Sequence, residues 1–305
     1  MLKKIIFMGT PYFAVPILKS LYQNGYNISA IYTQPPQTSN RGQKINKSPI
    51  QGFSETLNIE FRIPTTLKDN KEEYDFLKKL NADIAIVAAY GQILPKEILG
   101  LTKKGFINIH ASLLPKFRGS APIQRSIMNL EKQTGISIMK IAEKLDTGPI
   151  CNSYSLDILQ NENFESLSER LSLLAAEKIL DDIDAILEDK AVFKPQDDKK
   201  ATYAKKINKA ERKISWNESA KKIIGKINGL YPGAFFLYKG ERYKILKAEL
   251  SNAIGDPGVI LNDNFEIGCA NNAIKILEIQ RQGKNKQTTK EFLLGKKIIK
   301  GTSLL

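Results

Sequence analysis

The chain has 305 residues, of which 42% are hydrophobic, so it can bury a large core and is not a globally disordered protein. This length suits two domains better than one, and no apolar run approaches the roughly 20 residues that a transmembrane helix needs. The formal net charge is +14. The apolar stretch at residues 5–8 is too short for a signal peptide, so we interpret it as a first strand.

The charge and the cysteines indicate where the protein acts. Residues 206–305 carry a net charge of +10, and residues 1–205 carry +4. Frequent lysine codons could explain a basic chain, but the uneven distribution favours a domain that binds a polyanion, with nucleic acid as the first candidate. Cys151 and Cys269 are too few for a disulfide framework and too isolated for a thiolate metal site. We expect a cytoplasmic protein without a metal.

The first part of the chain alternates apolar strands with amphipathic helices. We expect strands at residues 3–8, 26–33, 82–90, 105–110, 135–142 and 149–155, and helices at 13–22, 122–130 and 164–188. A polar loop is expected at residues 34–47. A strand–helix–strand opening predicts an α/β domain with a Rossmann-like, mostly parallel sheet.

The rest of the chain has a different character. The apolar period is lost after residue 190, and beyond it we expect a short helix at 219–228 and strands at 234–238, 243–250, 258–261, 265–270 and 273–280. Short strands separated by Gly and Asn are typical of a small β-barrel of the OB-like kind. The predicted organisation is a catalytic domain at 1–189, a linker at 190–207 and a basic β-barrel domain at 208–305.

The glycine turn after the first strand is not a dinucleotide-binding motif. Gly9 is followed by Thr10, Pro11, Tyr12 and Phe13, so the second and third glycines of the G-x-G-x-x-G pattern are missing. Without them the backbone does not approach a pyrophosphate closely. The sequence therefore disfavours binding of NAD or ATP.

The single histidine is the strongest candidate for chemistry. His110 ends an expected strand, and Asn108 lies two residues earlier, so both side chains point to one face. Ligands of open parallel sheets bind beyond the C-terminal strand ends. A strand-end histidine often only caps backbone groups, yet any imidazole acid–base step in this chain must use His110.

Two nearby segments strengthen that interpretation. Residues 112–119 offer a hydroxyl, an apolar ledge and free backbone groups, and Asp146 lies in a tight turn between two expected strands. A carboxylate beside an imidazole fixes its tautomer and favours its charged form. Taken alone, Asp146 is equally compatible with an ordinary turn aspartate.

These residues also carry a resemblance to a known family. The segments INIHASLLPKFRG at 107–119 and LDTG at 145–148 resemble the N-x-H, S-L-L-P and distant Asp of the folate-dependent formyltransferases. The segments FMGTPYFA at 7–14, AYGQILP at 89–95 and TYAKK at 202–206 are similar to the branch that formylates methionyl-tRNA. The resemblance runs from the first strand through the linker.

The resemblance implies a reaction and its residues. The reaction is formyl transfer from 10-formyltetrahydrofolate to the α-amino group of methionine on initiator methionyl-tRNA. The implied roles are catalysis for Asn108, His110 and Asp146, and contact with the folate for the segment Ser112, Leu113, Leu114 and Pro115. Amine attack builds negative charge on the formyl oxygen, so Asn108 and His110 are expected to donate hydrogen bonds to it. Asp146 is expected to orient His110 and to accept the proton that leaves the amine.

The same resemblance assigns RNA contacts. Arg41 and Lys44 in the polar loop would contact the acceptor end of the tRNA, although this loop could instead be a solvated turn. Further contacts to the RNA backbone are expected from Lys205, Lys206, Lys209, Arg212 and Lys213. We expect a monomer with no membrane association.

Two other functions remain open at this point. A formyltransferase acting on an amino sugar nucleotide or on glycinamide ribonucleotide shares the same core motifs, and the basic second domain and the Arg41 loop count against it. A tRNA-binding module on an inactive scaffold is the other alternative. Asn108, His110 and Asp146 together count against that alternative.

Overall fold

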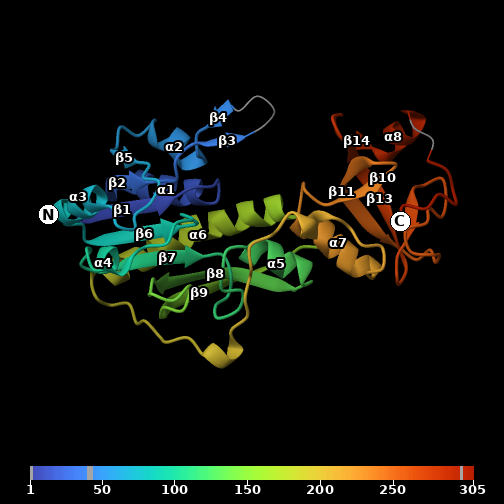
Figure 1. Ribbon diagram of the computed structural model, residues 1–305. Helices are drawn as coiled ribbons and strands as arrows, with labels where there is room; N and C mark the ends of the chain where they lie inside the picture. Colours follow the sequence, from blue (N-terminus) through green and yellow to red (C-terminus); the bar gives the residue numbers. More distant parts are fainter. Residues whose placement is uncertain (1–2, 40–43, 296–297) are drawn as a thin grey trace. The chain divides into compact units, whose positions relative to one another are not determined.

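The computed structural model describes residues 3–39, 44–295 and 298–305 and divides the chain into two compact units (Figure 1). The first unit comprises Met1–Ser120, Thr134–Leu156 and Ser168–Ala204. The second comprises Ala121–Gln133, Asp157–Leu167 and Lys205–Leu305. The segment that we expected to be a linker therefore packs with the first unit as far as Ala204.

A seven-stranded sheet in the order β5-β2-β1-β6-β7-β8-β9 forms the centre of the first unit (Figure 1). Neighbours from β5 to β7 pair in parallel, and β8 pairs antiparallel with β7. The strands are β1 (Lys4–Gly9), β2 (Asn27–Tyr32), β5 (Phe61–Arg62), β6 (Ile84–Ala88), β7 (Phe106–His110), β8 (Gln133–Lys140) and β9 (Ile150–Asp157). This mixed, mostly parallel sheet confirms the predicted fold class.

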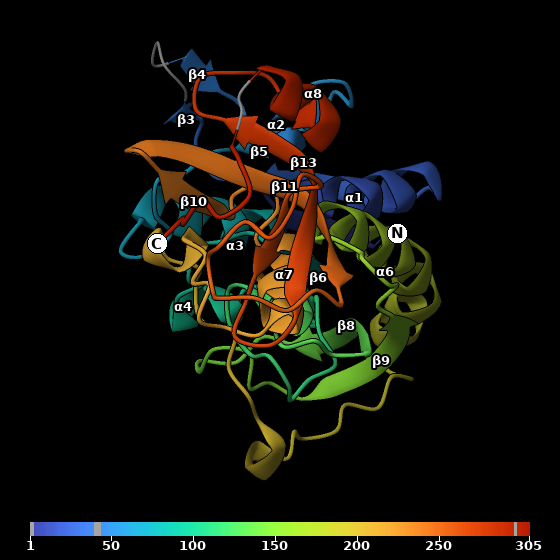
Figure 2. The same cartoon turned by 90° about the vertical axis from the view of Figure 1, so that its right-hand side faces the viewer.

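Helices cover both faces of this sheet, which is why its central strands are apolar throughout. Figure 2 shows α1 (Ala14–Gln23) and α6 (Phe164–Leu187) on one side and α3 (Lys71–Leu80) and α4 (Lys96–Leu99) on the other. The Ser20 hydroxyl of α1 donates a hydrogen bond of 2.8 Å to the Ala176 carbonyl oxygen of α6. A further short helix, α2 (Pro49–Ser54), follows the Ser48 N-cap.

Strand alternation determines which face carries the candidate residues. Met8 of β1, Val87 of β6 and Phe106 of β7 belong to the buried cluster that packs against α3 and α4. Val87 pairs with Asn108 in the parallel register. Since alternate residues share a face, Asn108 and His110 continue this row toward the C-terminal end of β7.

Several local expectations differ from the structure. The expected polar loop contains a two-stranded hairpin, β3 (Gln37–Ser39) and β4 (Lys44–Asn46). Residues 258–261 form only isolated bridges, because Val259 and Ile260 pair with Ser303 and Ile267 and not with a long neighbouring strand. The helices α2, α3 and α4 were not expected. Helix α3 begins at an Asn70 N-cap, and its buried residues are Glu73 and Leu77.

The second unit is built on a five-stranded antiparallel sheet in the order β10-β11-β13-β12, with β14 paired to β13. Its elements are α5 (Pro122–Met128), α7 (Ala220–Gly229), β10 (Phe235–Tyr238), β11 (Glu241–Ser251), β12 (Glu266–Gly268), β13 (Ala273–Arg281), β14 (Gln287–Thr288) and α8 (Thr289–Gly295). The buried rings of Phe236 and Tyr243 stack with centroids 5.3 Å apart, and Trp216 packs beside Phe236. This sheet confirms the predicted small β domain.

An ion pair inside the second unit gives a pH-dependent stability prediction. Arg125 of α5 donates to both carboxylate oxygens of Glu211, at 2.5 and 3.0 Å, and this bonding lowers the pKa of Glu211. We expect Glu211→Gln to lower the free energy of unfolding by about 1 kcal/mol at pH 7. The pKa of Glu211 is lower in the folded state than in the unfolded state. The difference in unfolding free energy between the two proteins should therefore be complete above the unfolded-state pKa of about 4.3, and it should disappear as the pH falls through the folded-state pKa. Urea unfolding of both proteins at pH 7 and pH 3 measures this, and an equal loss at both pH values would contradict it.

Candidate functional site

The side chain of His110, at the end of β7, is held by a hydrogen bond to a backbone carbonyl group of the following loop. Its side chain is 7% exposed, and Nε2 lies 3.0 Å from the Phe117 carbonyl oxygen. A carbonyl oxygen only accepts hydrogen bonds, so Nε2 carries a proton and donates. Phe117 reaches this position with φ at 59°, in the left-handed region that a bulky residue rarely adopts. The ring nitrogen left to face the site is therefore Nδ1.

Asp146 is brought to that nitrogen from 36 positions further along the chain. Its Oδ2 lies 3.8 Å from His110 Nδ1, which is an ion-pair distance and longer than a hydrogen bond. The same oxygen accepts a hydrogen bond of 2.7 Å from the Gly119 amide. The structure thus joins His110 and Asp146 as expected from the sequence, but the bond that orients the ring comes from Phe117.

Asn108 supplies an unengaged amide on the same face. Its side chain is partly buried and forms no hydrogen bond with any residue that the structure describes. A partly buried amide without a protein partner is suited to a ligand, because its hydrogen-bonding groups are otherwise poorly satisfied. Asn108 and His110 therefore place an amide and an imidazole nitrogen on one face at the strand end.

The loop after β7 has an internal hydrogen-bond network. The Ser112 side chain is fully buried, and its hydroxyl donates 2.6 Å to the Lys116 carbonyl oxygen. Ser137 of β8 donates to the Ser112 carbonyl oxygen at 2.8 Å and accepts from the Leu114 amide at 3.0 Å. The Ser112 hydroxyl, which we expected to face the folate, is thus used to shape the loop. Ser137 lies on another strand, so no local pattern around His110 predicts its role.

The apolar part of this loop remains accessible in places. Leu113 and Pro115 are partly buried, whereas Leu114 is 8% exposed. The Leu114–Pro115 peptide bond is cis. Two partly open apolar side chains make a ledge suited to a flat ring.

Two further residues support both loops and were not found from the sequence. Arg118 is only 2% exposed although it carries a full charge. Its guanidinium donates to Gln196 Oε1 at 2.8 and 3.0 Å and to Asp198 at 2.7 Å. Gln196 lies in a segment without apolar periodicity, so no local signal marks it.

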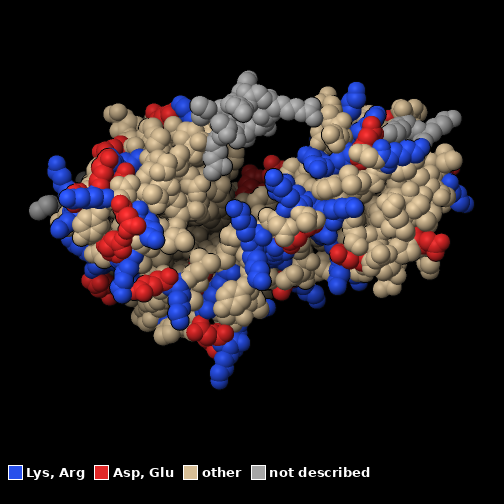
Figure 3. Space-filling view, viewed as in Figure 1, with Lys and Arg blue, Asp and Glu red and all other residues tan. Residues whose placement is uncertain are grey.

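The expected RNA-contact residues are described in part. Arg41 lies outside the described residues, as does the side chain of Lys44. The remaining expected contacts are exposed and form no ion pair with a described residue; these are Lys205, Lys206, Lys209, Arg212 and Lys213. On the face drawn in Figure 3, blue Lys and Arg side chains outnumber red acidic ones. The structure leaves these cations free to meet a polyanion.

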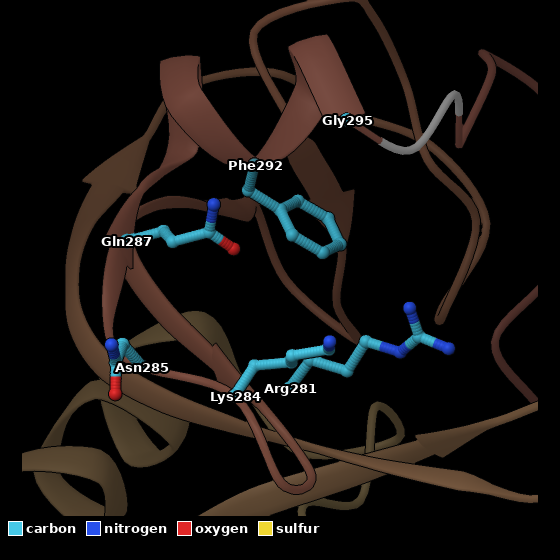
Figure 4. A pocket seen from close by; sticks show the side chains of 6 residues that line it. All are labelled: Arg281, Lys284, Asn285, Gln287, Phe292 and Gly295. Carbon is cyan, nitrogen blue, oxygen red and sulfur yellow. The ribbon is translucent and has the colours of Figure 1, made fainter.

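A separate hollow of about 280 Å³ lies in the second unit and is lined by Arg281, Lys284, Asn285, Gln287, Phe292 and Gly295 (Figure 4). The guanidinium of Arg281 already has a partner, since its Nε donates a hydrogen bond of 2.9 Å to the Glu241 carboxylate. The Phe292 ring is 3% exposed and leaves little surface for stacking. The hollow therefore offers a weaker set of groups than the β7 edge.

No helix within residues 3–39, 44–295 and 298–305 is long and apolar enough to cross a membrane. Within the same ranges, no group of three or more His, Cys, Asp or Glu side chains could hold a metal ion.

Comparison with known proteins gives matches along the full chain. The Formyl transferase family matches residues 3–183, and the Formyl transferase C-terminal domain matches residues 206–297. A methionyl-tRNA formyltransferase of Pelagibacter ubique is 64% identical over 307 residues, covering 100% of this chain and 99% of that protein. A methionyl-tRNA formyltransferase of Caldanaerobacter subterraneus is 41% identical over 307 residues, covering 99% of each.

Solved structures share the fold at low identity. An N-formyltransferase from Helicobacter canadensis, in complex with folinic acid and dTDP-3-aminofucose, superposes with a TM-score of 0.68 at 20% identity. The match covers 94% of this chain and 100% of that one. HypX from Aquifex aeolicus, in complex with tetrahydrofolic acid, has a TM-score of 0.66 at 16% identity, covering 96% of this chain and 47% of HypX.

Proposed function

The chain belongs to the methionyl-tRNA formyltransferase family, and we propose that it transfers a formyl group from 10-formyltetrahydrofolate to the α-amino group of methionine on initiator methionyl-tRNA. The 64% identity along the whole chain carries this proposal. The convergence of Asn108, His110 and Asp146 on one sheet edge supports it, because a formyl transfer needs donors for an oxyanion and an acceptor for a proton. The product would serve translation initiation in the cytoplasm, and we propose that the enzyme acts as a monomer.

The reaction joins the amine nitrogen to the formyl carbon and breaks the bond from that carbon to N10 of the folate. As the amine attacks, negative charge develops on the formyl oxygen. The Asn108 amide is free to donate to that oxygen, and His110 donates through Nδ1 because Nε2 is committed to Phe117. The Asp146 carboxylate lies 3.8 Å from Nδ1, so its negative charge faces this donor.

Asp146 is also suited to receive the proton that the amine loses. Its Oδ2 accepts the Gly119 amide at 2.7 Å, which leaves the other carboxylate oxygen for an incoming proton. The proton is finally needed at N10, whose bond to carbon breaks with its electron pair. One carboxylate can accept the proton early and return it later, so the sequence of steps balances without a covalent enzyme intermediate.

The folate would lie against the loop after β7. Leu113 and Pro115 provide a partly open apolar surface, Leu114 lies beneath it, and the Ser112 segment contributes through its backbone. Solved proteins with this fold hold folinic acid or tetrahydrofolic acid, which supports a folate co-substrate here. The reaction needs no metal, since amide and imidazole donors meet the charge on the oxygen.

The RNA would be bound mainly through its phosphates. The exposed cations Lys205, Lys206, Lys209 and Arg212 follow one another along the start of the second unit, and Arg41 and Lys44 are assigned the acceptor end by the family resemblance. Phosphate contacts give affinity without reading sequence. The net charge of +10 over residues 206–305 supports this assignment.

We expect Lys206→Ala to weaken tRNA binding and to reduce the slope of log Kd against log salt by somewhat less than one, roughly 0.7–0.9, because one phosphate contact is lost. Filter binding at several salt concentrations measures this slope. Lys19→Ala is the control, since Lys19 is an exposed residue of α1 in the first unit. An unchanged slope for Lys206→Ala would remove this residue from the RNA-contact set.

The direct test is an assay of formyl-methionine on charged initiator tRNA, with 10-formyltetrahydrofolate as donor. The same assay is run with a dTDP-linked amino sugar in place of the tRNA. Turnover on the sugar alone would refute the proposal in favour of a sugar formyltransferase. Binding of tRNA without turnover on either amine would refute it in favour of an inactive scaffold.

A further inference from the structure

Within the first unit, the segment from Lys194 to Ala204 contacts both the loop that follows His110 and the turn that carries Asp146. Toward the loop after β7, the Phe117 amide donates to Thr202 Oγ1 at 2.9 Å and the Ala204 amide donates to the Arg118 carbonyl oxygen at 2.7 Å. Toward the Asp146 turn, the segment uses the side chain of Gln196. One stretch of chain therefore braces both sides of the site.

Gln196 holds the Asp146 turn by its backbone. Its Nε2 donates to the Asp146 carbonyl oxygen and to the Gly148 carbonyl oxygen, each at 2.8 Å. An amide nitrogen has two protons, so these two bonds use its full donor capacity. Among the described residues, neither carbonyl oxygen has another hydrogen-bond donor.

The orientation of that amide is determined by Arg118. The guanidinium has donors only, so the atom facing it at 2.8 and 3.0 Å must be the amide oxygen. The nitrogen is then turned toward the Asp146 turn. Because Arg118 is 2% exposed, solvent does not compete for this contact. The buried Arg118 cation thus orients the Gln196 amide so that its nitrogen donates both hydrogen bonds to the Asp146 turn.

The turn needs such support because its backbone is strained. Asp146 has φ at 52°, in the left-handed region that an L residue adopts at a cost. Its carboxylate must nevertheless meet both the Gly119 amide and His110 Nδ1. A small relaxation of the turn would move Oδ2 away from both groups.

We propose that Gln196 is a positioning residue for formyl transfer, which maintains the Asp146 carboxylate opposite His110 Nδ1 through its two hydrogen bonds to the Asp146 turn. The inference rests on the proposed function for its kinetic part. Misplacement of a catalytic group by about 1 Å can cost about 100-fold in rate. Loss of Gln196 should therefore reduce kcat and leave KM for both substrates nearly unchanged.

The test uses two variants of the full chain. Gln196→Met removes the amide and leaves Arg118 without this partner. Gln196→Glu keeps an acceptor for Arg118 but puts a carboxylate oxygen, which cannot donate, opposite the two carbonyl oxygens of the turn. Both should lower kcat about 10- to 100-fold with KM for tRNA and folate within about two-fold of the wild type. The control is Gln133→Met, since Gln133 is exposed and its amide donates to Asp157 in the second unit. Wild-type kcat in folded Gln196→Glu, or an equal loss in Gln133→Met, would overturn the inference.

A second measurement does not depend on turnover. His110 is the only histidine, so protein made with isotope-labelled histidine gives a single pair of ring nitrogen signals. In Gln196→Glu the Nδ1 signal should move, because the facing carboxylate is displaced, and the Nε2 signal should stay, because Phe117 still accepts from it. An unchanged Nδ1 signal would overturn the inference. A wild type that fails to formylate methionyl-tRNA would instead refute the proposed function and leave this measurement valid.

Discussion

Replacing His110 with alanine should reduce kcat for formylation about 100- to 1000-fold, because one of two donors to the developing oxyanion is lost. The affinity for tRNA should stay within about two-fold, since His110 is 7% exposed and lies at the end of β7 in the first unit, away in sequence from the exposed cations at 205–213. Single-turnover formylation at saturating substrates measures the rate, and filter binding measures the affinity.

The variant is informative only if it folds. The alanine removes the hydrogen bond to the Phe117 carbonyl oxygen, so circular dichroism and urea unfolding should accompany the kinetics. A large loss of tRNA affinity with kcat unchanged would identify His110 as a contact residue and would contradict the oxyanion role. In that case Asn108 would be the only side-chain donor left at the strand end.

Asp146→Asn should lower kcat about 100-fold or more, although the side chain keeps its shape. The amide oxygen can still accept from the Gly119 amide, so the loop contact at 2.7 Å is retained. What disappears is the negative charge 3.8 Å from His110 Nδ1 and the only proposed acceptor for the amine proton. Steady-state kinetics against tRNA and folate separate this loss in kcat from any change in KM.

The matched control for that substitution is Asp189→Asn. Asp189 is another aspartate with positive φ, at 61°, but it is exposed and pairs only with Lys104 among the described residues. Its replacement should change kcat by less than about two-fold, as is usual for a surface ion pair. Equal losses in the two variants would show that the loss does not come from the charge that Asp146 places opposite His110, and would contradict this prediction.

The strand that carries Asn108 and His110 was predictable because its signals are local. Residues 106–110 form a short, mostly apolar run that is typical of a buried strand. Strand geometry alone then places Asn108 and His110 on one face. The opening strand and helix followed for the same reason, since five buried residues of β1 precede an apolar helix face. Helix α3 was missed because its buried positions include the charged Glu73 and only one aliphatic residue, Leu77.

By itself, the sequence determined the fold class, the strand that carries His110 and Asn108, and the basic second unit, since each follows from periodicity or composition over neighbouring residues. The family resemblance added the reaction and the proposed role of Asp146. Only the tertiary structure decided which imidazole nitrogen is engaged, that the Ser112 hydroxyl bonds within its own loop, and that Gln196 holds the Asp146 turn. These contacts join residues from different loops, and their geometry depends on left-handed backbone conformations at Phe117 and Asp146 that no local pattern specifies.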